Sequence, residues 1–262
     1  MAGFNVVRAR SYVFRLPLFT RVVGVVMMLA WVASLQSAWD IKAWAALKPS
    51  EINLKTLYRT NTFVFVHRGL FHALMNAVAL TPLLERFESE YGTLSSVALF
   101  IGPFSTIPAL LYVFIERAIF RVDNAVMGAS IWVFLLLGME AIRTYRTNPH
   151  LVIATHQVPT WTTPLVLCLV ISALVPGTSL LGHLCGLGVG YLGGLGYLKF
   201  LSPPEKVLRF VEGKLNLLGR LPHYVSVDQK TYGRFGVLPS SGPSPGSGPA
   251  IGLVGSTQRL GP

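Results

Sequence analysis

The sequence predicts an all-α membrane protein, a bundle of six transmembrane helices with both termini in the cytosol. The chain of 262 residues is 52% apolar and only 13% charged, a composition that excludes an ordinary soluble domain. Several apolar runs approach the length of a membrane-spanning helix. The positive charges are unevenly distributed along the chain, which favours one orientation in the bilayer.

Six apolar runs are candidate spans. They are Leu18–Ala38, Phe63–Leu84, Leu94–Ile115, Ala125–Gly138, Thr160–Val175 and Ser179–Leu198. The last two come from one run that is too long for a single helix, and Pro176-Gly177 supplies the turn that divides it. The first span follows a basic start, so a cleaved signal peptide is the alternative to a retained anchor there. The five further spans predict a multi-pass protein in either case.

The orientation follows from the Lys and Arg residues. With both termini in the cytosol, the inner segments hold 14 of the 22 Lys and Arg residues and the outer loops hold six, as the positive-inside rule requires. The net charge of +11 does not indicate nucleic-acid binding, because these residues form no basic face interleaved with exposed aromatics. We therefore expect the lipid bilayer, and no nucleic acid, as a partner.

Four segments make up the predicted domain organisation. A basic arm at the membrane surface (1–17) precedes the six-helix domain (18–200). A basic amphipathic juxtamembrane segment (201–236) follows, with apolar residues at helical spacing in Val207, Leu208, Val211, Leu215 and Leu218. The Gly/Pro/Ser-rich tail (237–262) is predicted to be disordered and to serve as a docking segment for a cytosolic partner.

Ser130 stands at the start of the fourth span, two residues after Gly128. Gly128 permits a flexible turn, so Ser130 is expected in the first turn of a helix. Unpaired backbone N–H groups and the positive end of the helix dipole there suit an oxygen that must become negative. Serine is also common in membrane helices as a small packing residue, so Ser130 alone does not define a site.

The second span carries three polar side chains, His67, His72 and Asn76. His72 and Asn76 are four residues apart and share one helix face, about 6 Å from each other. They could hydrogen-bond neighbouring helices or take part in chemistry. A zinc site is disfavoured, because His67 and His72 do not share a face if both are helical and no carboxylate or cysteine lies nearby.

The sixth span has glycine at every fourth position, Gly182, Gly186, Gly190 and Gly194, and His183 at its start. Such a smooth ridge permits very close helix approach. Another helix can therefore bring a polar group within hydrogen-bond reach of His183. Both cysteines, Cys168 and Cys185, fall inside apolar spans and indicate core residues without a disulfide.

The second, fourth and sixth spans run in the same direction, which brings their polar side chains to a similar depth. We expect one site, because separate burial of unpaired polar groups costs roughly 1–3 kcal/mol each. His183 can accept the proton of Ser130 as its oxygen attacks a peptide carbonyl, and His72 and Asn76 can donate to the oxyanion. No aspartate lies in a span near His183, so the prediction is a Ser-His dyad that needs neither metal nor cofactor.

These residues resemble the rhomboid intramembrane serine proteases, and most of all the fungal group found in Golgi or other secretory membranes. The resemblance covers residues 20–200 and rests on His67-x4-His72-x3-Asn76, Gly128-x-Ser130 and His183-x2-Gly186-x3-Gly190. It implies a six-helix rhomboid bundle with Ser130 as nucleophile and His183 as base. It also implies an oxyanion and substrate-binding site at His72, Asn76 and Gly128, and supporting roles for His67, Gly186 and Gly190.

The implied activity is endoproteolysis of transmembrane protein substrates near the lumenal membrane boundary, through an acyl-enzyme. One departure concerns Ile131, which stands where the family has a second glycine; it would narrow the pocket beside the nucleophile or alter a helix contact. The alternative functions are a catalytically silent relative that binds membrane clients and a transporter. The first would lack Ser or His, and the second would show repeat symmetry between halves, which the sequence does not.

Overall fold

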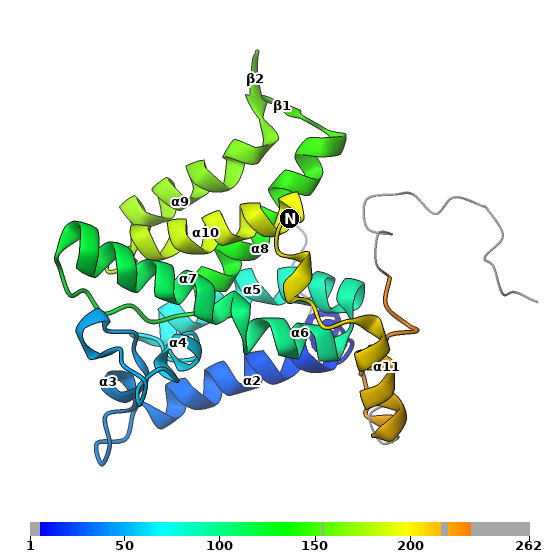
Figure 1. Ribbon diagram of the computed structural model, residues 1–262, viewed down its shortest axis with the longest axis horizontal. Helices are drawn as coiled ribbons and strands as arrows, with labels where there is room; N and C mark the ends of the chain where they lie inside the picture. Colours follow the sequence, from blue (N-terminus) through cyan, green and yellow to red (C-terminus); the bar gives the residue numbers. More distant parts are fainter. Residues whose placement is uncertain (1–5, 154, 216–219, 232–262) are drawn as a thin grey trace, which may run out of the picture.

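The computed structural model describes residues 6–153, 155–215 and 220–231, which are mostly helical (Figure 1). The longer helices are α1 (Val6–Val13), α2 (Leu18–Ala33), α5 (Leu70–Tyr91), α6 (Thr93–Phe100), α7 (Pro103–Phe114), α8 (Ser130–Thr147), α9 (Thr163–Leu174), α10 (Leu180–Leu195) and α11 (Glu205–Lys214). The shorter elements are α3 (Ile41–Ala45), η1 (Pro49–Glu51), α4 (Arg59–Thr62), η2 (Ile115–Phe120), η3 (Thr160–Thr162) and η4 (Lys199–Leu201). The predicted tail, 237–262, lies outside the described residues.

Each predicted span contains a helix, but several bounds were wrong: α5 ends at Tyr91 instead of Leu84, and α8 ends at Thr147 instead of Gly138. The first helix ends at Ala33, the second begins at Leu70 instead of Phe63, and the fourth begins at Ser130 instead of Ala125. The last two differences have one cause. The Phe63 carbonyl accepts the Gly128 N–H at 2.8 Å and Val126 forms a β-bridge with Leu47, so these backbone groups are used between segments and not within a helix.

The expectation of an all-α chain was wrong in one place. Strands β1 (His150–Ile153) and β2 (His156–Pro159) form an antiparallel hairpin after α8. Pro149 stops the helix, and the β-branched and long apolar residues that follow favour extended structure. Helical structure also continues beyond the predicted end of the third span at Ile115, because η2 continues α7 to Phe120.

Helix length alone does not give the predicted six crossings. Among the described residues, one stretch, Thr93–Phe120, is long and apolar enough to cross a membrane by itself. The pair Leu180–Leu195 and Lys199–Lys214 would pass the same criterion together, but it is bent by 93°. Leu18–Ala33 and Thr160–Leu174 are apolar but shorter.

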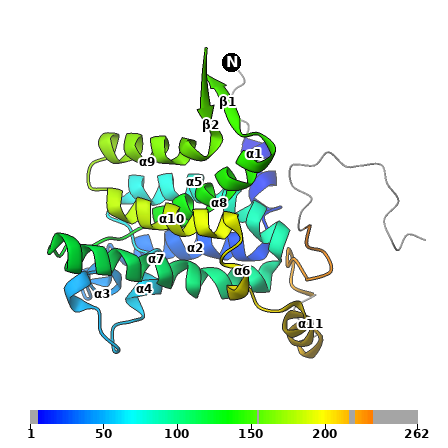
Figure 2. The same ribbon diagram turned by 45° about the horizontal axis from the view of Figure 1, so that its top comes forward.

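The glycine-bearing helix α10 lies against α8, with α7 and α9 also beside it (Figures 1 and 2). A Cβ atom added at Gly186 would lie 2.3 Å from the Ile131 carbonyl oxygen, and one at Gly190 would lie 2.1 Å from that of Leu135. No side chain fits at these positions, so the predicted close approach along the glycine ridge is confirmed. This contact sets the spacing of the two helices on which Ser130 and His183 stand.

Glu88 joins three parts of the chain at one end of the bundle. Its carboxylate is fully buried and accepts bonds from the Phe19 N–H, the Thr20 N–H and hydroxyl, and the Thr93 hydroxyl, all within 2.8 Å. The carboxylate thereby caps the N-terminus of α2, where a negative charge is favoured. Thr93 in turn exchanges hydrogen bonds with Val225, which fastens the 220–231 segment to the α5–α6 turn.

Helix α11 lies within the predicted juxtamembrane segment. Leu208 is buried on one side, whereas Val207 and Phe210 are exposed on the other. Leu218 lies outside the described residues. Both views place α11 and α1 at one end of the bundle, with α3 at the opposite end (Figures 1 and 2).

Replacement of Gly190 by alanine tests the close approach of the helices. The new methyl group would overlap the Leu135 carbonyl and force α8 and α10 apart, so we expect Gly190→Ala to lower the free energy of unfolding by about 3 kcal/mol. Gly188 is the matched control, since nothing lies within 4 Å of an added Cβ there. Unfolding by sodium dodecyl sulfate, titrated from a mild detergent, measures both variants, and equal stability would contradict the packing.

Replacement of Glu88 by alanine tests the buried carboxylate. Four donors would lose their acceptor at once, so we expect the free energy of unfolding to fall by at least ~3 kcal/mol. Glu85→Ala is the control, because Glu85 lies on the same helix and accepts one exposed bond, from Tyr12, which is worth about 1 kcal/mol or less. The same detergent titration compares the two, and a Glu88 variant as stable as the Glu85 variant would refute this role.

Candidate active site

Ser130 begins α8 because the chain before it is extended and turns sharply. Gly128 has a φ of +115°, a backbone conformation that side chains rarely adopt. A Cβ atom there would also lie 2.8 Å from Cε1 of His72. Gly128 is therefore required both for the turn and for the approach of the His72 ring. The prediction that Ser130 occupies a first helical turn is confirmed.

His183 lies in the first turn of α10, after Ser179, whose hydroxyl caps the helix by accepting the Gly182 N–H. Its ring is 1% exposed, and its Nε2 lies 3.0 Å from the Ser130 Oγ. The ring centroid of Phe134 lies 4.5 Å away, at an interplanar angle of 31°, and limits its tilt. The predicted contact between the serine hydroxyl and the imidazole is thus confirmed.

Ser172 of α9 was missed by the sequence reasoning. Its Oγ lies 3.3 Å from Nδ1 of His183, on the opposite side of the ring from Ser130. If Nδ1–H donates to Ser172, Nε2 keeps the lone pair that can accept the Ser130 proton. A serine within an apolar span indicates packing and not chemistry. One signal could have identified Ser172. It lies shortly before the Pro176-Gly177 turn and His183 lies shortly after it, so the turn brings the two residues together.

His72 and Asn76 are one turn apart on α5, as predicted. The Asn76 side-chain N–H donates to the His72 carbonyl at 2.8 Å, and neither ring nitrogen of His72 has a hydrogen-bond partner among the described residues; Nδ1 is fully buried. The His72 ring and the second N–H of Asn76 therefore have hydrogen-bonding capacity left for a ligand.

His67 and His72 were expected not to share a face if both were helical, but His67 lies outside the helix, so that condition is not met. His67 precedes α5, and the two ring centroids are 5.2 Å apart in an edge-to-face arrangement. His67 is fully buried, and its Nε2 accepts the Ala129 N–H at 3.4 Å. Through that bond it contacts the residue directly before Ser130.

The polar groups open into one apolar cavity of about 140 Å³. Ser130, His183, His72 and Asn76 line it together with apolar side chains from α5, α8 and α9: Phe71, Met75, Val133, Phe134, Leu167 and Ile171. Ile131 is buried in the core, and its carbonyl and side chain face Gly186. Of the two expectations for Ile131, the altered helix contact is therefore the one that applies.

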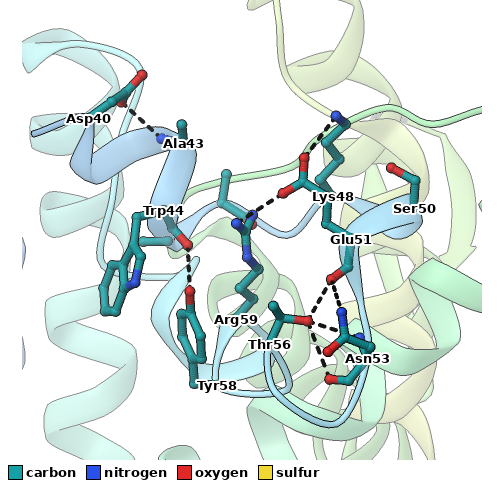
Figure 3. Close-up of polar contacts among 12 residues, drawn as sticks. Asp40, Ala43, Trp44, Lys48, Ser50, Glu51, Asn53, Thr56, Tyr58 and Arg59 are labelled. Atoms are coloured by element: carbon teal, nitrogen blue, oxygen red, sulfur yellow. Dashed lines mark hydrogen bonds and ion pairs between the residues drawn. The ribbon is translucent and has the colours of Figure 1, made fainter.

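The loop from residue 39 to residue 62 is held together by polar contacts among its own residues (Figure 3). Trp44 stacks on Tyr58 at a centroid distance of 4.8 Å, and Arg59 donates to the Ala46 carbonyl and forms an ion pair with Glu51 at 2.9 Å. Glu51 also pairs with Lys48 at 2.9 Å, and that hydrogen bond lowers the pKa of the Glu51 carboxyl.

Two sets of contacts join this loop to the segment that precedes Ser130. The Ser50 hydroxyl and N–H donate to Asp123, which lowers the pKa of the Asp123 carboxyl. Leu47 exchanges backbone hydrogen bonds of 2.9 and 3.0 Å with Val126, four residues before Ser130. The loop and the serine-bearing segment are thus joined by both backbone and side chains.

Comparison with known proteins identifies the family. Residues 54–200 match the model of the Rhomboid domain, which is more than half of the chain. The chain belongs to the rhomboid family. It is 63% identical to "Rhomboid-type serine protease 2" of Neurospora crassa over 99% of this chain and 95% of that protein. It is 57% identical to the protein of the same description in Podospora anserina, over 100% and 99%.

A third relative has the same enzyme class. "Rhomboid-type serine protease B" of Aspergillus fumigatus is 56% identical over 99% of this chain and 96% of that protein. The predicted class, a rhomboid-type serine protease, is confirmed by these full-length relatives. Membership of the family also makes this chain a multi-pass helical membrane protein.

Replacement of Ser172 tests its contact with His183. Loss of one hydrogen bond of about 1 kcal/mol predicts roughly a fivefold fall in kcat for Ser172→Ala. KM should not change, since Ser172 does not line the cavity. Ser172→Thr keeps the hydroxyl and should retain most of the rate. Steady-state cleavage of a transmembrane substrate in detergent separates kcat from KM, and an equal loss in both variants would indicate packing alone.

Proposed function

We propose that this rhomboid-type serine protease is an intramembrane endopeptidase that cleaves transmembrane protein substrates near the lumenal boundary of the membrane, with Ser130 and His183 as its catalytic dyad. The observation that supports this most directly is the 3.0 Å contact of the two side chains at the edge of an apolar cavity. A hydroxyl and an imidazole at this separation can exchange a proton. The apolar lining suits a hydrophobic peptide segment.

The proposed reaction uses the groups already described. Nε2 of His183 accepts the Ser130 proton while Oγ bonds to the substrate carbonyl carbon, and the carbonyl electrons move to its oxygen. The Ser130 N–H, His72 and Asn76 are proposed to donate to that oxyanion, each such donor being worth about 3 kcal/mol. His183 then gives the proton to the leaving amine as the C–N bond breaks, and water hydrolyses the acyl-enzyme by the reverse proton route.

Supporting roles are proposed for the surrounding residues. Gly128 makes room for His72, His67 accepts the Ala129 N–H, and Gly186 and Gly190 let α8 meet α10. These contacts hold the segment and the helix that carry the two reacting side chains. A misplacement of about 1 Å can cost roughly 10²-fold in rate, so a proton transfer over 3.0 Å depends on these contacts.

The proposed topology has six crossings with both termini in the cytosol, in a Golgi or other secretory-pathway membrane. The shared end of α1 and α11 (Figure 2) and the excess of Lys and Arg in the segments assigned to that side favour it. The proposed domains are the arm (1–17), the protease domain (18–200), the juxtamembrane segment (201–236) and the tail (237–262), which would bind a cytosolic partner.

Single substitutions test the dyad. We expect Ser130→Ala and His183→Ala each to reduce cleavage of a transmembrane model substrate by at least about 10³-fold, since neither partner acts without the other. Ser34→Ala and His150→Ala, remote from the cavity, should cleave at the parental rate. A fluorophosphonate probe should label the parent and not Ser130→Ala. Labelling that persists in Ser130→Ala would place the nucleophile elsewhere.

A further inference from the structure

A second and larger cavity lies at the other end of α8 from Ser130. It has a volume of about 420 Å³ and lies between α6, α8, α10 and α11. Arg143, which lines it, is 13 residues beyond Ser130 in the same helix, or about 20 Å at 1.5 Å per residue. The cavity is therefore separate from the site where the proposed cleavage occurs.

The wall of this cavity is strongly cationic. Arg143, Arg146, Lys199 and Lys230 line it, with Glu205 as the one carboxylate in the lining. The Lys230 ammonium lies 3.7 Å from the Glu205 carboxylate. Arg143 donates to both carboxylate oxygens of Glu90, which is not part of the lining, at 2.9 Å. Two positive charges, those of Arg146 and Lys199, remain without a carboxylate partner in the described part of the chain.

The contacts of these two cations leave them open to a ligand. Arg146 donates to the Leu195 carbonyl at 3.2 Å, a neutral acceptor. The Lys199 ammonium has no hydrogen-bond partner among the residues that the structure describes, although its side chain lies beside Gly196. Ser95, 6% exposed, also lines the cavity, and its hydroxyl makes no hydrogen bond to another described residue.

The remaining surface of the cavity is apolar. Phe87, Leu99, Phe104 and Met139 contribute from the bundle, and Leu198 and Leu208 from the chain that leaves it. A ligand that satisfies both kinds of surface carries an anion and a hydrophobic part. The uncompensated charge is about +2, which matches a phosphomonoester, with −1.5 to −2 at neutral pH, better than a phosphodiester with a single negative charge.

We propose that this cavity binds the phosphomonoester headgroup of an anionic phospholipid from the leaflet at this end of the bundle, with Arg146 and Lys199 as its principal ligands. Positively charged pockets between helices at a membrane surface are suited to such headgroups. Arg146 supplies planar, paired N–H groups and Lys199 a mobile point charge. The apolar lining holds the glycerol and the first part of the acyl chains. Since Arg146 belongs to α8, Lys199 follows α10 and the apolar Leu208 belongs to α11, the bound lipid would contact all three parts of the chain.

Lipid retention by the purified full-length chain tests this proposal. Native mass spectrometry from detergent micelles would be titrated with dioleoyl phosphatidic acid, dioleoyl phosphatidylcholine or inorganic phosphate. We expect phosphatidic acid to be retained at concentrations where phosphatidylcholine is not. The Arg146→Gln/Lys199→Gln double variant should bind it roughly 30-fold more weakly, since each cation contributes about fivefold at a membrane surface. Lys206→Gln, an exposed charge of α11 outside the cavity, should bind like the parent.

Three outcomes would overturn the proposal: equal retention of the two lipids, equal affinity of the double variant and the parent, or retention of inorganic phosphate that displaces phosphatidic acid at equal concentration. The last result would assign the site to a soluble phosphate compound. The affected side chains are exposed or at the cavity surface, so folding should be intact. The Ser130 labelling by fluorophosphonate checks this in the same sample, and it keeps failure of the lipid site distinct from failure of the protease assignment.

Discussion

The close contact of α8 with α10 is the constraint on which the proposed site depends. Gly186 and Gly190 leave only backbone on the α10 surface, and the carbonyls of Ile131 and Leu135 occupy that space. A transmembrane bundle has little hydrophobic driving force to bring helices together, so van der Waals contact at small residues supplies it. Ser130 and His183 lie in the first turns of these two helices. The spacing of the helices therefore determines the distance between Ser130 Oγ and His183 Nε2.

The close packing of α10 could be predicted from the sequence, but the residue at which α8 begins could not. Apolar runs separated by Pro and Gly predicted the helical segments, and the four-residue glycine spacing predicted which face of α10 packs closely. Those signals are local and periodic. The start of α8 at Ser130 depends on hydrogen bonds from Gly128 to Phe63 and between Val126 and Leu47, which join residues that are about 60 to 80 positions apart. The pattern of residues within one segment does not indicate a hydrogen-bond partner so far away in the sequence.

The proposed site was likewise predicted in part. Ser130, His183, His72 and Asn76 were predicted to lie together, and the structure gathers all four around one cavity. Ser172 was missed because its contact with His183 comes from the turn between α9 and α10. His67 and His72 were expected to lie on different faces if one helix continued through both. A break at Gly69 instead lets His67 reach Ala129.

The anchoring of the 220–231 segment has a consequence for the residues that follow it. Thr231 donates to the Ser89 carbonyl through both its N–H and its hydroxyl, so the last described residue before the tail is fixed to α5. That point is on the end of the bundle that carries α11, far along α8 from the nucleophile. The cytosolic partner proposed for the tail would therefore be tethered at a high local concentration beside that end. Under the proposed function, recruitment and peptide-bond cleavage would take place at opposite ends of the bundle, so that neither would block the other.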